Sequence, residues 1–566
     1  MATALLSAGG AVRPRIGRDG WIMRAALAGL GLYLLITVIL PLIAMLQKSL
    51  QDKDGAFVGP ANFIRYFGDP ALSGAIVNSL EVALLSTAIT IAIAFTYAYA
   101  LSRSAMPGKG LFRAIALVPL LAPSLLPGLA LVYLFGNKGM LKGLLFGETI
   151  YGPIGIVIGE VFFALPHALI IIITALAAAD QRLYEAAEAM RARPHRIFLT
   201  VTLPGCRYGL ISAAFVVFTL VFTDFGVPKV IGGSYDVLAT DIYKQVIGQF
   251  NFSMGAEVGL ILLTPAVISF AVDRVIARRQ VALLSARAVP YQPKPHRGRD
   301  LACLVFCAIV GLLIVGLLAT AAFGSIVTYW PYNLTPTLGH YDFNAIDPNG
   351  WGAFANSLIL SALTALFGTA IVFSGAYLIE KSTGSRRLRG AIQFMCMLPL
   401  AVPGLVLGLS YIFFFNAAAN PLHFIYATMA ILVVNTISHF YTVCHLTATT
   451  ALKQIDAEFE AVSASLKVPF YRTFWRVTVP VCLPAILDIA IYLFVNAMTT
   501  VSAVVFLYSA DTKLASIAVL NMDDAGKTAN ACAMGMLIVA TSATVRGLQS
   551  LLAQRLGRTQ AWRRRG

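Results

Sequence analysis

The sequence predicts an all-α, polytopic membrane protein made of two tandem six-helix repeats, with about 12 transmembrane helices. Its composition is the first reason: of 566 residues, 58% are hydrophobic and 12% are charged, whereas soluble domains contain roughly 25% charged residues. The second reason is that the apolar residues gather in stretches of about 20, long enough to cross a bilayer. The third is that these stretches form two sets of six with shared markers.

Twelve apolar stretches are expected to cross the membrane. They cover residues 25–46, 76–100, 113–135, 153–178, 209–228 and 257–277, and then 301–325, 354–380, 391–415, 425–448, 483–508 and 529–553. A basic, proline-containing segment separates the two sets. We therefore expect a first unit at 1–277, a cytoplasmic linker at 278–300 and a second unit at 301–566. The first stretch is longer than a signal-peptide core and lacks a clear cleavage site, so it should remain as a membrane helix.

Most lysines and arginines gather in the connecting segments on one side of the membrane. In a soluble protein a net charge of +16 would suggest a nucleic-acid partner. Here 33 of the 42 lysines and arginines lie in or beside the segments on one side of the membrane, starting with the N-terminal segment. The positive-inside rule assigns that side to the cytoplasm. We therefore expect a lipid bilayer around the chain, both termini in the cytoplasm, and no nucleic-acid partner.

The two sets of stretches repeat at an offset of about 276 residues. Pro127 in the third stretch corresponds to Pro403 in the ninth, and the triplet Asn78-Ser79-Leu80 recurs as Asn356-Ser357-Leu358 at an offset of 278. Each copy contains an even number of stretches, so the copies share one orientation and are related by an axis along the membrane normal. One chain should therefore form a pseudo-dimer around a central pathway.

The polar segment between the fourth and fifth stretches is long for a simple turn, so we expect a partner to dock there. Apolar residues at helical spacing form a narrow stripe in it, made of Leu183, Ala186, Ala187 and Met190. The second half keeps most of this stripe 276 residues later, at Phe459, Val462 and Leu466. Such helices fit an apolar groove on a partner protein. The alternative is a connector that touches only lipid headgroups.

The first loop resembles the coupling loop of the membrane subunits of binding-protein-dependent ABC importers. That motif begins Glu-Ala-Ala, has glycine six residues after the glutamate, and closes with Leu-Pro. The matching residues here are Glu185, Ala186, Ala187 and Pro204, and Arg191 stands at the glycine position. The second loop is a degenerate copy, with Glu460 beside the glutamate position Ala461, Lys467 at the glycine position, and Pro480 at the end.

This resemblance implies a fused, type I importer permease in a bacterial inner membrane. It implies two copies of a cytoplasmic ABC ATPase at the two loops and a periplasmic solute-binding protein at the opposite face. ATP and Mg2+ would be used by the ATPase, so we expect no cofactor, no catalytic residue and no metal site in this chain. Its single Gly-Lys-Thr, at 526–528, lacks the first glycine of a phosphate-binding loop.

Ionisable groups within apolar stretches are candidates for substrate contacts. Asp224, near the outer end of the fifth stretch, either binds a substrate amine or cation, or is an acid at the end of its helix that pairs with Lys229 or reaches water. Glu81 is a secondary candidate. Pro127 and Pro403 interrupt the helical hydrogen bonds, which frees carbonyls for a pathway or a hinge, although kinked packing explains them equally well.

The substrate is expected from resemblance alone. Residues 223–233 and 237–245 resemble the 2-aminoethylphosphonate branch of fused permeases more closely than the related ferric iron branch. We therefore expect 2-aminoethylphosphonate or a related phosphonate, with ferric iron as the alternative. His439 and His445 are six residues apart, about 240° around a helix, and so cannot share an iron without help. An ion-coupled secondary transporter is a further alternative with the same twelve spans.

Overall fold

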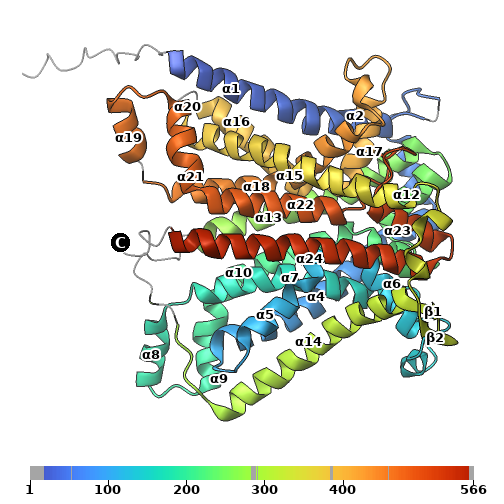
Figure 1. The fold of residues 1–566 in the computed structure, drawn as a ribbon, viewed down its shortest axis with the longest axis horizontal. Coiled ribbons are helices and arrows are strands. Elements are labelled where there is room, and N and C mark those ends of the chain that lie inside the picture. The colour runs from blue at the N-terminus through green and yellow to red at the C-terminus, as the bar shows by residue number, and fades with distance from the viewer. Residues whose placement is uncertain are drawn as a thin grey trace, which may run out of the picture.

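The computed structural model describes residues 18–52, 54–281, 289, 291–382, 386–456 and 458–559. Within these ranges the regular structure is almost entirely helical, and the long helices run side by side in one bundle (Figure 1). The strands described are β1 (Val327–Tyr329) and β2 (Asn333–Pro336), which pair as an antiparallel hairpin. The all-α prediction is confirmed.

The helices of the first unit follow the predicted stretches. They are α1 (Arg18–Leu34), α2 (Leu40–Ser49), α3 (Ala61–Gly68), α4 (Pro70–Arg103), α5 (Lys109–Leu117), α6 (Leu125–Phe135), α7 (Pro153–Ala177), α8 (Gln181–Ala189), α9 (Pro194–Ile197), α10 (Leu203–Thr223), α11 (Gly226–Ile231), α12 (Leu238–Tyr243) and α13 (Phe252–Val281).

The second unit repeats this order. Its helices are α14 (Arg297–Ile326), α15 (Gly350–Lys381), α16 (Arg386–Met397), α17 (Gly404–Phe415), α18 (Met429–Lys453), α19 (Glu458–Ser465), α20 (Phe470–Thr473), α21 (Val479–Val481), α22 (Leu483–Thr499), α23 (Ala515–Asp524) and α24 (Thr528–Thr559). In the described residues nine helices are long and apolar enough to cross a membrane, or up to 12 if each of three bent pairs counts as one span. The predicted helix number is thereby confirmed.

The third and ninth predicted spans are broken helices. The axis turns by 102° before α6 and by 115° before α17. Pro403 lies at the second break, directly before the first residue of α17. Pro127 instead lies in the first turn of α6, where its missing N–H removes no helical hydrogen bond. Of these two prolines, only Pro403 is therefore at a break.

The predicted spans 209–228 and 483–508 extend too far. Helix α10 ends at Thr223 and α22 ends at Thr499, because Asp224 and Thr500 both adopt extended backbone conformations. The apolar residues that follow, such as Phe225 and Val504, are buried inside the protein rather than continuing the helix. Hydropathy does not distinguish an apolar segment buried inside the protein from the continuation of a membrane-spanning helix. The sequence therefore overestimates the length of both spans.

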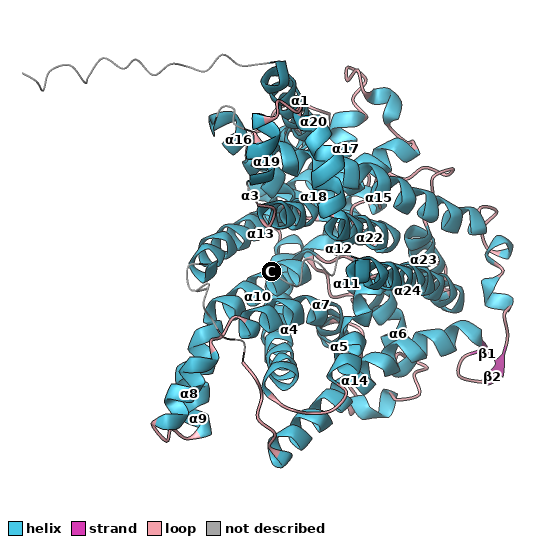
Figure 2. Ribbon diagram, turned by 60° about the vertical axis from the view of Figure 1, so that its left-hand side comes forward, coloured by secondary structure: helices cyan, strands magenta, loops and turns pink. Residues whose placement is uncertain are grey.

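The first helices of the two units are exchanged in space. α1 and α2 pack against α15, α16 and α17 of the second unit, whereas α14 packs against α4, α5 and α6 of the first. Figure 1 and Figure 2 both show α14 beside α5 and α1 beside α16. The two units therefore interlock.

The repeated Asn-Ser-Leu triplets hold equivalent outer segments in place. The Ser79 hydroxyl accepts a hydrogen bond from the Leu238 N–H at 2.8 Å, where α12 begins. The Ser357 hydroxyl accepts one from the Ala515 N–H at 2.7 Å, where α23 begins. The asparagines before them donate to backbone carbonyls of the same segments. Each triplet thus satisfies buried backbone groups that the start of a helix leaves unpaired.

Candidate functional site

Two short helices, α8 and α19, lie at the same end of the bundle, beyond the ends of the long helices (Figure 1). On α8, Leu183 is 58% exposed and Met190, just after the helix, is 76% exposed. The side chains of Glu185 and Ala186 are also exposed, whereas Ala187 faces inward and is buried. Helix α8 therefore presents an apolar patch flanked by a carboxylate.

Helix α19 presents a similar face. Its exposed apolar side chains are Phe459, Val462 and, just beyond the helix, Leu466, at 47%, 55% and 69% exposure. The side chain of Ala461 lies outside the described residues. Apolar side chains of this size, grouped on one exposed surface, are typical of a protein-binding site.

Arg191 and Lys467 occupy the left-handed backbone conformation that the coupling motif assigns to glycine. Their φ angles are 53° and 54°. The N–H of the next residue bonds back across the end of the helix, from Ala192 to Ala187 and from Val468 to Ser463. This is the Schellman closure that usually has glycine at its left-handed position. The turn survives without glycine, although L side chains are strained in this conformation.

Each short helix is tied to the end of a long helix. The guanidinium carbon of Arg103, at the end of α4, lies 5.4 Å from the centre of the Tyr184 ring on α8. The Tyr184 hydroxyl in turn donates to Thr202 at 3.1 Å. In the second half, Lys381 at the end of α15 forms a 2.8 Å ion pair with Glu460 on α19. Both links join the second span of a unit to its short helix.

The linker between the units lies along α8. The Gln181 N–H donates to the Val289 carbonyl at 3.0 Å, and the rings of Tyr184 and Tyr291 are 4.6 Å apart. Lys294 forms an ion pair with Glu188, whose hydrogen bond raises the pKa of the lysine.

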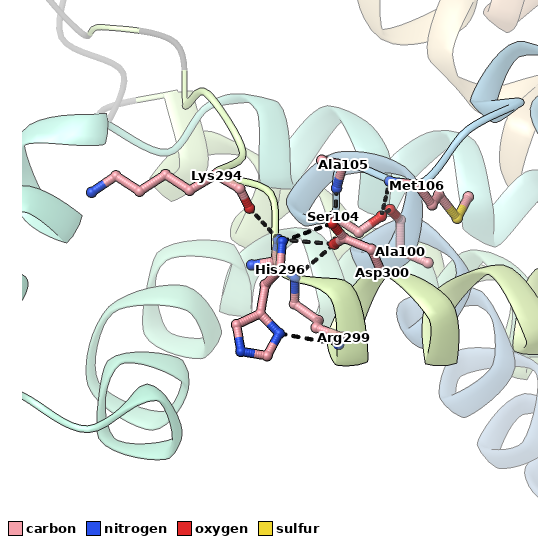
Figure 3. Close-up of polar contacts among 8 residues, drawn as sticks. All are labelled: Ala100, Ser104, Ala105, Met106, Lys294, His296, Arg299 and Asp300. Atoms are coloured by element: carbon pink, nitrogen blue, oxygen red, sulfur yellow. Dashed lines mark hydrogen bonds and ion pairs between the residues drawn. The ribbon is translucent and has the colours of Figure 1, made fainter.

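The end of the linker is pinned to the start of α14. Figure 3 shows the Asp300 carboxylate accepting hydrogen bonds from the N–H groups of Ala105 and His296, at 3.0 and 2.9 Å. Arg299 donates to the carbonyl of Lys294. This cluster fixes the linker against the segment that follows α4.

A cavity of about 320 Å³ lies where the two units meet. Equivalent elements of both units line it: α7 and α18, α10 and α22, and the two helix breaks. Its polar lining includes Ser124, His167, Thr219, Thr223, Asp224, His439, Thr442, Tyr492, Asn496, Thr499, Thr500 and Ser502. Among the described lining residues none is lysine or arginine. The cavity therefore has polar walls and lacks a fixed positive side chain.

The expected pathway residues separate into two groups. Asp224 and Pro403 line the cavity. Pro127 is buried within α6, and Glu81 is exposed and accepts a hydrogen bond from Tyr235 at 3.1 Å. Lys229 pairs with Asp524 at 2.9 Å rather than with Asp224.

Asp224 is held by the backbone that follows it. Its carboxylate accepts a 2.9 Å hydrogen bond from the Val227 N–H and interacts with Ser124 and with a second acid, Glu160. Glu160 is not among the pathway residues expected from the sequence. Its signal is a carboxyl group in the fourth apolar stretch, the same signal that marks Asp224 in the fifth.

A metal centre does not emerge from the described residues: no three His, Cys, Asp or Glu side chains there are grouped to hold a metal ion. His167 and His439 line the cavity from α7 and α18. The Nδ1 atoms of both rings have no hydrogen-bond partner. Both imidazoles thus border the cavity, while their Nδ1 atoms are themselves buried.

Comparison with known proteins shows that the chain matches one protein family twice. The model for the binding-protein-dependent transport system inner membrane component matches residues 88–282 and again 375–558. The chain is 28% identical to the ferric transport system permease protein FbpB of Actinobacillus pleuropneumoniae, over 91% of this chain and 76% of that protein. A putative FbpB of Haemophilus influenzae is also 28% identical, over 87% of this chain and 78% of that protein.

A phosphonate relative matches less of the chain. The putative 2-aminoethylphosphonate transport system permease protein PhnU of Salmonella typhi is 22% identical, over 42% of this chain and 86% of that protein. Similarity to the ferric permeases thus extends over both units, whereas similarity to the phosphonate permease extends over less than half of the chain.

Proposed function

The chain belongs to the family of inner membrane components of binding-protein-dependent transport systems, and from that premise we propose that it is a two-unit ABC importer permease whose α8 and α19 each dock one cytoplasmic ATPase. The observation that carries this proposal is the pair of exposed apolar faces, Leu183 with Met190 and Val462 with Leu466, at one end of the bundle. Each face fits the helix-in-groove mode of protein recognition.

In this proposal ATP drives the transport cycle through the two short helices. Closure of the ATPases on ATP moves α8 and α19 as rigid bodies. The links at Arg103 and Lys381 pass that motion to α4 and α15. The two units then rock about the cavity between inward-open and outward-open packings. ATP hydrolysis belongs to the partner, and this chain supplies the path.

The proposed orientation places α8, α19 and both termini on the cytoplasmic side of the inner membrane. The basic residues support it, since most of them lie at this end of the spans. The opposite end carries β1, β2, α12 and α23 (Figure 1). We infer that this end receives a periplasmic solute-binding protein.

For the solute, ferric iron is the first candidate. Two ferric permeases match both units of the chain. The cavity is also lined by Asp224 and by the imidazoles of His167 and His439, and no described lysine or arginine lines it. Carboxylate and imidazole groups suit a metal cation. A cavity lining without a described lysine or arginine side chain disfavours a purely anionic solute.

2-Aminoethylphosphonate is the second candidate, because it carries a positive ammonium group and a negative phosphonate group. Asp224 can meet its ammonium group. The helix beginnings at Ser124 and Gly404 line the same cavity, and a helix N-terminus favours an anionic group. The PhnU relative supports this candidate for part of the chain.

Charge substitution at the two exposed faces tests the docking role. Leu183→Glu and Val462→Glu should abolish co-purification of the ATPase and ATP-dependent uptake, because each places a charge in an apolar contact. Leu338→Glu is the matched control: Leu338 is 75% exposed, next to β2 at the opposite end. Uptake that persists without any ATPase would instead establish an ion-coupled secondary transporter.

A further inference from the structure

A second acid, Glu160, lies close to Asp224. Glu160 on α7 is fully buried, and neither of its carboxyl oxygens accepts a hydrogen bond from a donor group. It interacts with the carboxyl group of Asp224. Two neighbouring carboxylates repel each other unless a positive charge lies between them. Glu160 and Asp224, the acid pair, are therefore suited to a positively charged group.

The acid pair reaches the central cavity through Asp224. Asp224 and Ser124 are among the residues that line this space, and they come from facing breaks in the first unit. The Val227 N–H occupies one Asp224 oxygen. The titratable groups that share the cavity are His167 of α7, His439 of α18 and Tyr492 of α22. A solute in the cavity can therefore reach the pair. Among the described residues that line the cavity, none is a lysine or arginine that could neutralise it.

The fold itself does not require these acids. At the offset of 276, Glu160 corresponds to Thr436 and Asp224 corresponds to Thr500. Both threonines are buried in the same architecture, and the Thr436 hydroxyl bonds to its own helix, at the Leu432 carbonyl. Buried carboxyl groups without a cation are costly inside a membrane protein. A feature that is costly and present in one unit only points to a ligand.

We propose that Glu160 and Asp224 form a cation-binding site on the translocation pathway, which takes either a hard metal cation or the ammonium group of the transported solute. The cation lies between the two carboxyl groups and removes the repulsion that they exert on each other when both are ionised. This inference rests on the proposed permease function and adds to it the charge of the solute and the residues that meet it.

Carbodiimide labelling tests the site directly on the full chain in membranes. Dicyclohexylcarbodiimide reacts with protonated carboxyl groups in apolar surroundings, and peptide mass spectrometry locates the adduct. We expect labelling of Glu160 or Asp224, and at least a tenfold decrease with buffered Fe3+ or with 2-aminoethylphosphonate. Glu257 is the matched control, since it too is fully buried with unpaired oxygens, but its charged neighbour is Arg65, which does not line the cavity, whereas that of Glu160 is the cavity-lining Asp224.

The control carboxyl should keep the same label with either probe. Absence of label from both Glu160 and Asp224, or label on them that neither probe reduces, would overturn the site. The two probes also separate the sources of the cation: protection by Fe3+ alone identifies a metal cation, and protection by the aminophosphonate alone identifies an ammonium group.

Moving the pair between units provides the second test. Glu160→Thr with Asp224→Thr gives the first unit the residues of the second, and should lower uptake of the wild-type solute at least tenfold. Adding Thr436→Glu and Thr500→Asp rebuilds the pair across the pathway and should restore uptake. Wild-type uptake in the double-threonine variant would refute the site. Failure of the ATPase to co-purify with the wild-type chain would refute the permease function instead.

Discussion

Lys381 and Glu460 form a 2.8 Å ion pair at the place where the first unit has Arg103 over the ring of Tyr184. Both lysine and arginine end the second span of their units, 278 residues apart, and both partners lie on the short docking helix. The mechanical link is thus kept while its chemistry changes from a cation–π contact to a partly buried ion pair. Two structurally equivalent loops therefore need not respond equally to salt or to mutation.

The Lys381–Glu460 link predicts a charge-reversal rescue. Lys381→Glu should weaken ATPase association by about fivefold, or roughly 1 kcal/mol, because it sets two carboxylates against each other. Lys381→Glu with Glu460→Lys should recover most of this loss. Titration of the purified permease with its ATPase measures both. A double variant no better than the single one would show that the ion pair does not hold α19.

The left-handed residues predict that glycine stabilises both loops. Arg191→Gly and Lys467→Gly relieve a conformation that costs an L residue roughly 1 kcal/mol, so each should raise the free energy of unfolding slightly. Arg193→Gly removes a nearby charge where φ is −67°, and should not stabilise. Thermal unfolding of the purified variants makes the comparison. Equal effects at 191 and 193 would contradict the strain argument.

The serine anchors predict matching losses in the two units. Ser79→Ala and Ser357→Ala each leave a buried N–H unpaired, at Leu238 and at Ala515, which costs about 1–3 kcal/mol. Ser73→Ala removes a hydroxyl that bonds only within its own turn, to the Asp69 carbonyl, and should change stability by less than about 0.5 kcal/mol. Denaturant unfolding distinguishes them. A large loss at position 73 would remove the capping explanation.

The sequence predicts the features that depend on local pattern. Hydropathy locates the helices, and the 276-residue offset pairs Arg191 with Lys467, which share one backbone conformation. Asp224 is visible as an acid in an apolar stretch. The importance of Glu160 depends on Asp224, which lies 64 residues further along the chain, and hydropathy gives no distance between two spans. The packing of α14 against α5 is hidden for the same reason, since an apolar helix face fits many neighbours.

Asp523 near the end of α23 predicts that the stability of the protein depends on pH. Burial, together with the neighbouring carboxylate of Asp524, raises the pKa of Asp523 from 3.8 to about 6. A raised acid pKa means that the folded state holds its proton more tightly than the unfolded chain. Its stabilising effect is therefore complete below about pH 4, declines between pH 4 and 6, and is absent above.

Replacing Asp523 with asparagine should remove this dependence. Asp523→Asn should melt at a higher temperature than wild type at pH 7.5, where the wild-type carboxylate is ionised beside Asp524, and at the same temperature near pH 4, where it is neutral. Asp511→Asn, at an exposed position before α23, should match wild type at both values. Thermal melts of the purified protein give the comparison. A difference that persists at pH 4 would mean that asparagine acts through packing, because protonation would then no longer distinguish the two proteins.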